Sequence, residues 1–199
     1  MKFTKMHGCG NDYVYVNLFE EKLDDPARVS IYVSDRHFGI GSDGLITIGP
    51  SDKADFRMRI YNADGSEAEM CGNGIRCVAK YVYDHKLTDK TEISVETGAG
   101  IKYLTLYVEE NKVSQVRVGE PILTPGDIPV VKADGSAYGD DYRVIDEPIS
   151  AGNREWHMTC VSMGNPHAVV FVDDVAGFEL EKYGPLFENH KMFPKRTNT

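Results

Sequence analysis

A cysteine set among glycines is the feature of the sequence best suited to chemistry. Cys71, Gly72, Asn73 and Gly74 lead directly into a predicted helix at residues 74–85. Glycines let backbone N–H groups approach a ligand. A helix N-terminus carries unpaired donors and partial positive charge, which suit a carboxylate and stabilise a thiolate. The pattern therefore favours a reactive Cys71 over the small buried residue that most cysteines are.

The other cysteines and the histidines lack such a context. Cys77 falls inside the predicted helix and is expected to pack, and Cys9 and Cys160 are expected to be structural. Four cysteines without a C-x-x-C pair argue against a disulfide framework and a zinc ribbon, so we expect reduced thiols. The histidines show no metal-ligand spacing such as H-E-x-x-H, so no metal is expected.

A second polar group opens a later strand. Asn165 can bind a ligand carboxylate or amine, and His167 can tune a thiol, but a plain turn with an exposed imidazole fits the pattern equally well. Gly164 and Asn165 also repeat Gly10 and Asn11, 154 positions earlier, and each pair precedes a predicted strand. The repeat hints at two similar lobes.

A glycine motif at residues 39–44 is interpreted as a structural turn. It matches G-x-G-x-x-G, but dinucleotide binding requires a strand before the motif and a helix after it. Here a predicted helix precedes the motif and a strand-like apolar run follows it.

Most of the elements that must position these residues are predicted to be strands. Alternating apolar residues predict strands at residues 12–18, 55–61, 92–96, 101–108, 113–118, 155–161 and 167–172, with a hairpin turn at 109–112. Helices are predicted at residues 25–38, 74–85 and 184–191. Three prolines within residues 119–129 indicate a crossing between lobes 1–117 and 118–199.

Composition excludes several classes of partner. The chain has 31 acidic and 22 basic residues and a net charge of −9, which argues against a nucleic-acid partner. No apolar stretch approaches the ~20 residues of a membrane helix, and no secretory signal pattern stands at the N-terminus. We therefore expect a cytoplasmic protein with no membrane partner.

Five segments together resemble the diaminopimelate epimerase family: HGCGNDYVYVN, DRHFGIGSDGL, NADGSEAEMCGNGIRCVAKY, VSMGNPHAVVFV and GPLFENHKMFPKRTNT. The segments occur in the order of the family over the whole chain from Met1 to Thr199, and the M-C-G-N-G block is specific for this family. The resemblance implies an α/β fold of the α+β type with two pseudo-symmetric lobes. Each lobe would be a curved, mostly antiparallel sheet around a central helix, with the second lobe incomplete here.

The resemblance also implies an activity: epimerisation of LL-diaminopimelate to the meso form, for lysine and peptidoglycan synthesis, without pyridoxal phosphate or another cofactor. One thiolate would remove the α-proton while a thiol on the other face returns one. By resemblance Cys71 is one of these two cysteines, His167 modulates cysteine acidity, and six residues bind substrate: Asn11, Asn62, Gly72, Asn73, Asn165 and Asn198. Gly44 replaces a substrate-contacting glutamine of some members, so no contact is expected there. The residues do not indicate an oligomeric state, and the resemblance leaves a homodimer open, since family members are often dimers.

One departure from the family pattern is large. The second cysteine of the family lies in an E-R-G…A-C-G-T-G segment that these 199 residues lack, and Cys160, within a predicted strand, is no substitute. We therefore expect the chain as given to bind substrate weakly without inverting it, and its second lobe to be poorly stable. Two other classes remain open: a cysteine hydrolase or transferase, and a non-catalytic relative that binds an amino acid.

Overall fold

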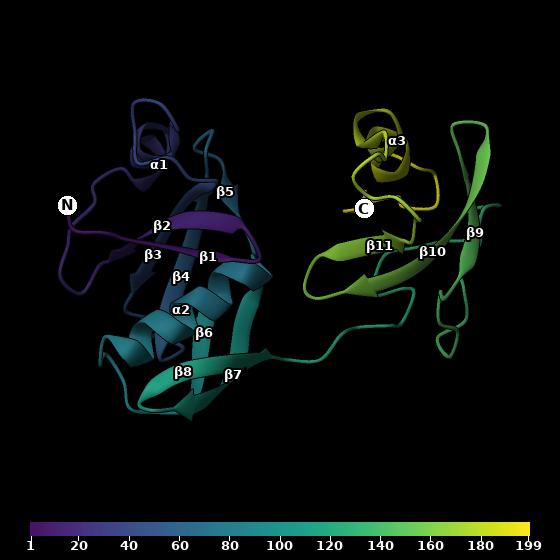
Figure 1. The fold of residues 1–199 in the computed structure, drawn as a ribbon. Coiled ribbons are helices and arrows are strands. Elements are labelled where there is room, and N and C mark those ends of the chain that lie inside the picture. The colour runs from purple at the N-terminus through teal and green to yellow at the C-terminus, as the bar shows by residue number, and fades with distance from the viewer. The chain divides into compact units, whose positions relative to one another are not determined.

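The computed structural model describes all 199 residues and divides them into two compact units (Figure 1). Unit 1 is Met1–Gly119 and unit 2 is Glu120–Thr199. None of the helices is long and apolar enough to cross a membrane.

Unit 1 is built on one eight-stranded sheet. Its strands are β1 (Thr4–Gly8), β2 (Asn11–Asn17), β3 (Gly44–Gly49), β4 (Phe56–Asn62), β5 (Glu67–Ala68), β6 (Glu92–Thr97), β7 (Gly100–Glu109) and β8 (Lys112–Val118). They run in the order β1-β2-β3-β4-β6-β7-β8, and β5 pairs with β4. Only the β2–β3 and β4–β6 pairs are parallel, so the sheet is mostly antiparallel.

The two faces of this sheet are covered by two helices. In β4, Met58 and Ile60 are buried while Arg57 and Arg59 point to solvent, as the side-chain alternation of a strand requires. All of β3 is buried, because α1 (Pro26–Ser34) covers one face of the central strands and α2 (Gly72–Asp84) covers the other.

Helix α2 (Gly72–Asp84) lies along the inner face of the curved sheet (Figure 1). It contacts β1, β2, β7 and β8. Its apolar side, which includes Ile75, Val78 and Val82, is fully buried in the core of unit 1. Burial of such side chains stabilises a domain by about 1.5–3 kcal/mol each, so this face holds the helix in place. The N-terminus of α2 is thereby fixed against the sheet.

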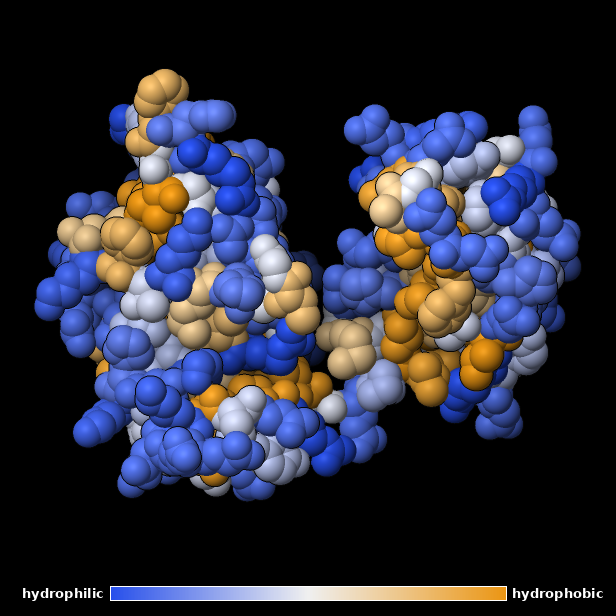
Figure 2. Space-filling model, viewed as in Figure 1, coloured by the Kyte–Doolittle hydropathy of each residue, from blue (hydrophilic) through white to orange (hydrophobic).

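Unit 2 contains a smaller antiparallel sheet in the order β11-β10-β9. Its elements are β9 (Glu147–Ala151), β10 (Arg154–Ser162), β11 (Pro166–Val170) and α3 (Leu180–Glu188). Trp156 makes edge contacts with Phe178 and Phe187 at the centre of its core. Large apolar side chains stay exposed around this core, including Phe171 at 85% and Val175 at 78%, and Figure 2 shows hydrophobic surface on the visible face of the unit.

The expected fold is confirmed, with differences in individual elements. A curved, mostly antiparallel sheet surrounds a central helix in unit 1, and every predicted strand is present within a few residues. Helix α1 ends at Ser34 and not at residue 38, because the Asp35 carboxylate accepts the backbone N–H groups of His37 and Phe38. Helix α3 begins at Leu180, earlier than predicted, and contains Pro185. Strands β1, β5 and β9 were not predicted.

Candidate active site

A tight hairpin turn places Asn11 at the start of β2. Gly8 and Asn11 face each other across the β1–β2 pair, and Cys9 and Gly10 form the turn with positive φ angles of 53° and 87°. Such angles suit a two-residue hairpin, and glycine adopts them without steric cost. The side chain of Asn11 is thereby held at the end of the sheet.

Cys71 caps the N-terminus of α2 through its own sulfur atom. Its backbone is extended, and the Gly74 N–H donates to Cys71 Sγ over 3.2 Å. The thiol in turn donates to Asn11 Oδ1 at 3.3 Å. A thiolate can accept from the backbone N–H, and a protonated thiol can donate to the amide oxygen. The half-buried thiol therefore has a partner for its charged form and a partner for its neutral form.

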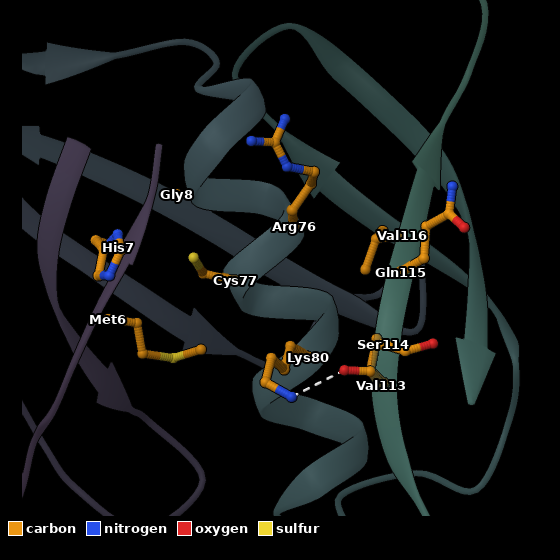
Figure 3. A pocket seen from close by; sticks show the side chains of 10 residues that line it. All are labelled: Met6, His7, Gly8, Arg76, Cys77, Lys80, Val113, Ser114, Gln115 and Val116. Atoms are coloured by element: carbon orange, nitrogen blue, oxygen red, sulfur yellow. Dashed lines mark hydrogen bonds between the residues drawn. The ribbon is translucent and has the colours of Figure 1, made fainter. Parts of the chain in front are cut away.

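The next turn of α2 is tied to the β1–β2 hairpin. Arg76 Nη2 donates to Asn73 Oδ1 at 2.5 Å and lies 3.7 Å from Cys9 Sγ. A pocket of about 420 Å³ runs along this side of α2 between β1 and β8, lined by Arg76, Cys77 and Lys80 from the helix (Figure 3). Cys71 does not line this pocket, so the pocket and the thiol are separate features of the helix.

Asn62 and Gly72 lie at the same end of unit 1 as Asn11. Tyr13 of β2 pairs with Gly44 of β3, and Gly44 pairs with Asn62 of β4. These three residues therefore lie side by side near this end of the sheet. The Asn62 amide donates to Ser66 Oγ at 3.0 Å within the predicted turn. A Cβ added to Gly72 would meet no atom within 4 Å, so there is open space beside the first residue of α2.

Charged residues surround Asn11 on its other side. Asp43 Oδ2 accepts from Asn11 Nδ2 at 2.8 Å, and Arg36 Nη2 lies 2.8 Å from Asp12 and 2.9 Å from Asp43. Arg36, and with it Lys5, holds the pKa of the Asp12 carboxyl well below its usual range. Burial raises the pKa of Tyr13 to about 12, and the nearby Cys71 adds to this effect.

Three predicted residues lie together in unit 2. His167 Nε2 is 3.2 Å from Asn165 Oδ1, and the Asn198 amide donates to the Pro166 carbonyl at 3.0 Å. The backbone of Asn198 also bridges to His167 beside β11. The structure thus groups the predicted site residues by unit: Cys71, Asn11, Asn62, Gly72 and Asn73 in unit 1, and Asn165, His167 and Asn198 in unit 2.

The remaining cysteines divide into two kinds. Cys77 and Cys160 are buried as expected, and burial raises the pKa of both thiols, that of Cys160 to about 12. The expectation of a structural Cys9 is wrong: it is exposed, because the tip of a hairpin directs its side chain away from the core.

Sequence reasoning also missed Asp43. This residue belongs to the glycine motif at residues 39–44, which was interpreted only as a turn. The structure confirms that a helix precedes this motif and a strand follows it. An acidic residue placed directly before a buried strand was the available signal for a polar role.

Comparison with known proteins gives close relatives along the whole chain. The family model for diaminopimelate epimerase matches residues 3–124. The chain is 98% identical over 201 residues to the diaminopimelate epimerase of Agathobacter rectalis, covering 100% of this chain and 70% of that protein. It is 58% identical over 200 residues to that of Methanococcus maripaludis, again covering 100% of this chain and 70% of the relative.

Solved structures resemble the fold at low sequence identity. A hydroxyproline epimerase from Agrobacterium vitis matches 84% of this chain and 50% of its own, with a TM-score of 0.53 and 14% identity. A PhzF-family phenazine biosynthesis protein of Bacillus anthracis matches 85% of this chain and 56% of its own, with a TM-score of 0.53 and 20% identity. The chain thus spans about half the length of these solved proteins, and the likeness concerns the fold alone. By its close relatives along the whole sequence, the chain belongs to the diaminopimelate epimerase family.

Proposed function

We propose that the chain serves the epimerisation of LL-2,6-diaminopimelate to the meso isomer, with Cys71 as one of two acid–base thiols. The observation that carries this proposal is the pair of hydrogen bonds at Cys71 Sγ, one received from Gly74 N–H and one donated to Asn11 Oδ1. An acid–base group must be stable with and without its proton, and these two partners support one state each.

The N-terminus of α2 suits the α-carboxylate of such a substrate. Its first N–H groups have no partner within the helix, and the open surface at Gly72 leaves room for a ligand. Negative charge that develops when the α-proton is removed would delocalise onto this carboxylate, where the donors are already in place. In this proposal Gly72 and Asn73 hold the carboxylate, with Asn11 and Asn62 beside them.

The residues of unit 2 are assigned by resemblance. Asn165 and Asn198 would bind substrate, and His167 would modulate the acidity of a cysteine. Their grouping around β11 supports a shared role. The proposal needs no cofactor, since both proton transfers are assigned to cysteine thiols.

A cysteine hydrolase is less well supported by the surroundings of the thiol. A hydrolase requires a base in contact with its nucleophile. The Gly74 N–H donates to Cys71 Sγ and the thiol donates to Asn11 Oδ1, and neither of these groups is a base. Tyr13 also lies beside the thiol, but burial raises its pKa to about 12, so its hydroxyl stays protonated at neutral pH.

The test is proton NMR of LL-diaminopimelate incubated with the protein in D₂O. We expect the α-proton signal to fall as deuterium enters, and Cys71→Ala to slow this uptake by at least about 10³-fold. Cys9→Ser is the matched control, because it removes an exposed thiol of the same unit and should leave uptake unchanged. The same variants of the Agathobacter rectalis relative provide the reference rate.

Each alternative predicts a different result. Deuterium uptake together with formation of the meso isomer would mean that a proton is removed from one face of the α-carbon and returned on the other. Deuterium uptake without inversion would mean that Cys71 works as a single base. Uptake that persists in Cys71→Ala would contradict the proposal. An acyl mass increment on Cys71 would support a hydrolase, and saturable binding with no uptake would support a non-catalytic relative.

A further inference from the structure

The Asn11 side chain lies between the Cys71 thiol and the Asp43 carboxylate, and it makes a hydrogen bond with each of them. Its Oδ1 is 3.3 Å from Cys71 Sγ, and its Nδ2 is 2.8 Å from Asp43 Oδ2. An amide can rotate by 180° and exchange these atoms, so its neighbours decide which atom faces the thiol. A carboxylate only accepts hydrogen bonds, so the NH₂ group must face Asp43 and the carbonyl oxygen must face Cys71.

Asp43 is itself held at both carboxylate oxygens. Arg36 Nη2 lies 2.9 Å from Oδ1, and the backbone N–H of Asp12 donates to Oδ2 at 3.0 Å. The backbone N–H of Asp43 donates to the Asp12 carbonyl at 2.7 Å, and this contact fixes the loop beside β2. Arg36 also pairs with the Asp12 carboxylate, which Lys5 contacts at 2.9 Å. The carboxylate therefore cannot turn away from Asn11 without breaking several contacts.

We propose that Asp43 is a positioning residue that locks the Asn11 amide with its carbonyl oxygen toward Cys71. A flipped amide would give the sulfur a second N–H donor beside Gly74 and hold it as a thiolate. The locked amide instead accepts from the protonated thiol. The orientation set by Asp43 keeps both protonation states of Cys71 accessible. The catalytic role of this amide orientation rests on the proposed function, but the orientation itself does not.

The test measures how alkylation of Cys71 by iodoacetamide depends on pH. Tryptic peptide 60–76 contains Cys71 and no other cysteine, so mass spectrometry reads this thiol alone. We expect Asp43→Ala to free the amide and to lower the midpoint of the pH profile by about one pH unit. Loss of the Asp43 charge would act in the same direction, so a double-mutant cycle is needed.

The cycle repeats Asp43→Ala in an Asn11→Ala background, where no amide is left to rotate. The titratable and charged neighbours of the thiol, Tyr13, Cys77 and the Asp12–Arg36 pair, are present in both backgrounds, so the cycle subtracts the direct effect of losing the Asp43 charge. We expect most of the shift to disappear in the Asn11→Ala background. Equal shifts in the two backgrounds, or no shift on Asp43→Ala in the native background, would overturn the proposal.

A conservative variant sharpens the result. Asp43→Asn keeps an oxygen that can accept from Asn11 and should move the midpoint by less than half as much as Asp43→Ala; an equal shift would count against the locking role. Thermal unfolding followed by circular dichroism checks that each variant is folded, and Asp43→Ser replaces Asp43→Ala if the alanine variant is not. Since alkylation needs no substrate, the result is independent of any deuterium uptake.

Discussion

The two Gly-Asn pairs of the chain show how one dipeptide serves two different local structures. Gly10-Asn11 closes a two-residue hairpin between β1 and β2, and Gly164-Asn165 lies in the longer turn between β10 and β11. Both glycines have positive φ angles, 87° and 110°. Asn11 contacts the Cys71 thiol from a distant element, whereas Asn165 contacts His167, two residues away. The two pairs therefore share a positive glycine φ, whereas the turns that they form and the partners of their amides differ.

The cysteines of the two units also differ in their surroundings, although the residue type is the same. Cys71 at the helix N-terminus of unit 1 is half-buried and has a backbone donor to its sulfur. Cys160 in the middle of β10 in unit 2 is 1% exposed, and burial raises its pKa to about 12. The position of a thiol relative to a helix end and to solvent decides its chemistry, and the residue type alone does not.

The largest expected difference is in alkylation of these two thiols. At pH 8 a pKa of about 12 leaves about one Cys160 thiol in 10⁴ ionised, and burial blocks access to it. We expect iodoacetamide to modify Cys71 at least about 10³-fold faster than Cys160, measured on tryptic peptides 60–76 and 155–182. In concentrated urea the two rates should converge. Similar rates in the native protein would mean that unit 2 opens readily.

Acid is expected to weaken unit 1 through Asp55. Lys90 Nζ lies 2.6 Å from Asp55 and, together with hydrogen bonds from Ser94, lowers the carboxyl pKa to about 2. Because the folded value is lower than the unfolded value near 3.9, the stabilisation is present above pH ~4 and is lost as the pH falls toward 2.

The measurement is urea unfolding by circular dichroism at several pH values. Asp55→Asn should cost about 1–2 kcal/mol at pH 6 and almost nothing near pH 2, with allowance for solvent screening of this partly exposed pair. Trp156, the one tryptophan of the chain, lies in unit 2 and serves as the control, since its fluorescence transition should not move. A loss independent of pH would contradict the role of the carboxylate charge.

The smallest expected effects concern the turn glycines themselves. Gly10→Ala would force a side chain into a positive φ and should cost about 1 kcal/mol in thermal unfolding, and Gly164→Ala somewhat more because its φ is larger. Gly72→Ala is the matched control: it begins a helix, and its added Cβ meets no atom within 4 Å. We expect no loss of stability there. Equal losses at all three positions would show that backbone strain is not the cause.

Local features of the site could be predicted from the sequence. The residues around Cys71 indicated the start of a helix, and the structure places the helix cap at this residue. The alternation of apolar residues predicted β4, and the Asn62–Gly65 segment forms the expected turn. Strand β1 was missed because its residues alternate between half-buried and exposed, without a buried apolar face. Strand β9 is short and contains Pro148, which argues against a strand.

Contacts between distant residues could not be predicted in this way. Asn11 and Cys71 are 60 positions apart, and Asn11 and Asp43 are 32 apart. Their meeting depends on the parallel pairing of β2 with β3 and on the packing of α2 inside the sheet. A shift of register by one residue would turn each side chain to the other face.

The sequence by itself determined a cysteine at a helix start, the positions of most strands and the family to which the chain belongs. These features depend on neighbouring residues, whose backbone preferences and apolar spacing act over a few positions. Only the tertiary structure decided that the Asn11 carbonyl faces Cys71, that Asp43 holds it there, and that Cys9 is exposed. Those outcomes follow from strand register, helix packing and the acceptor-only chemistry of a carboxylate.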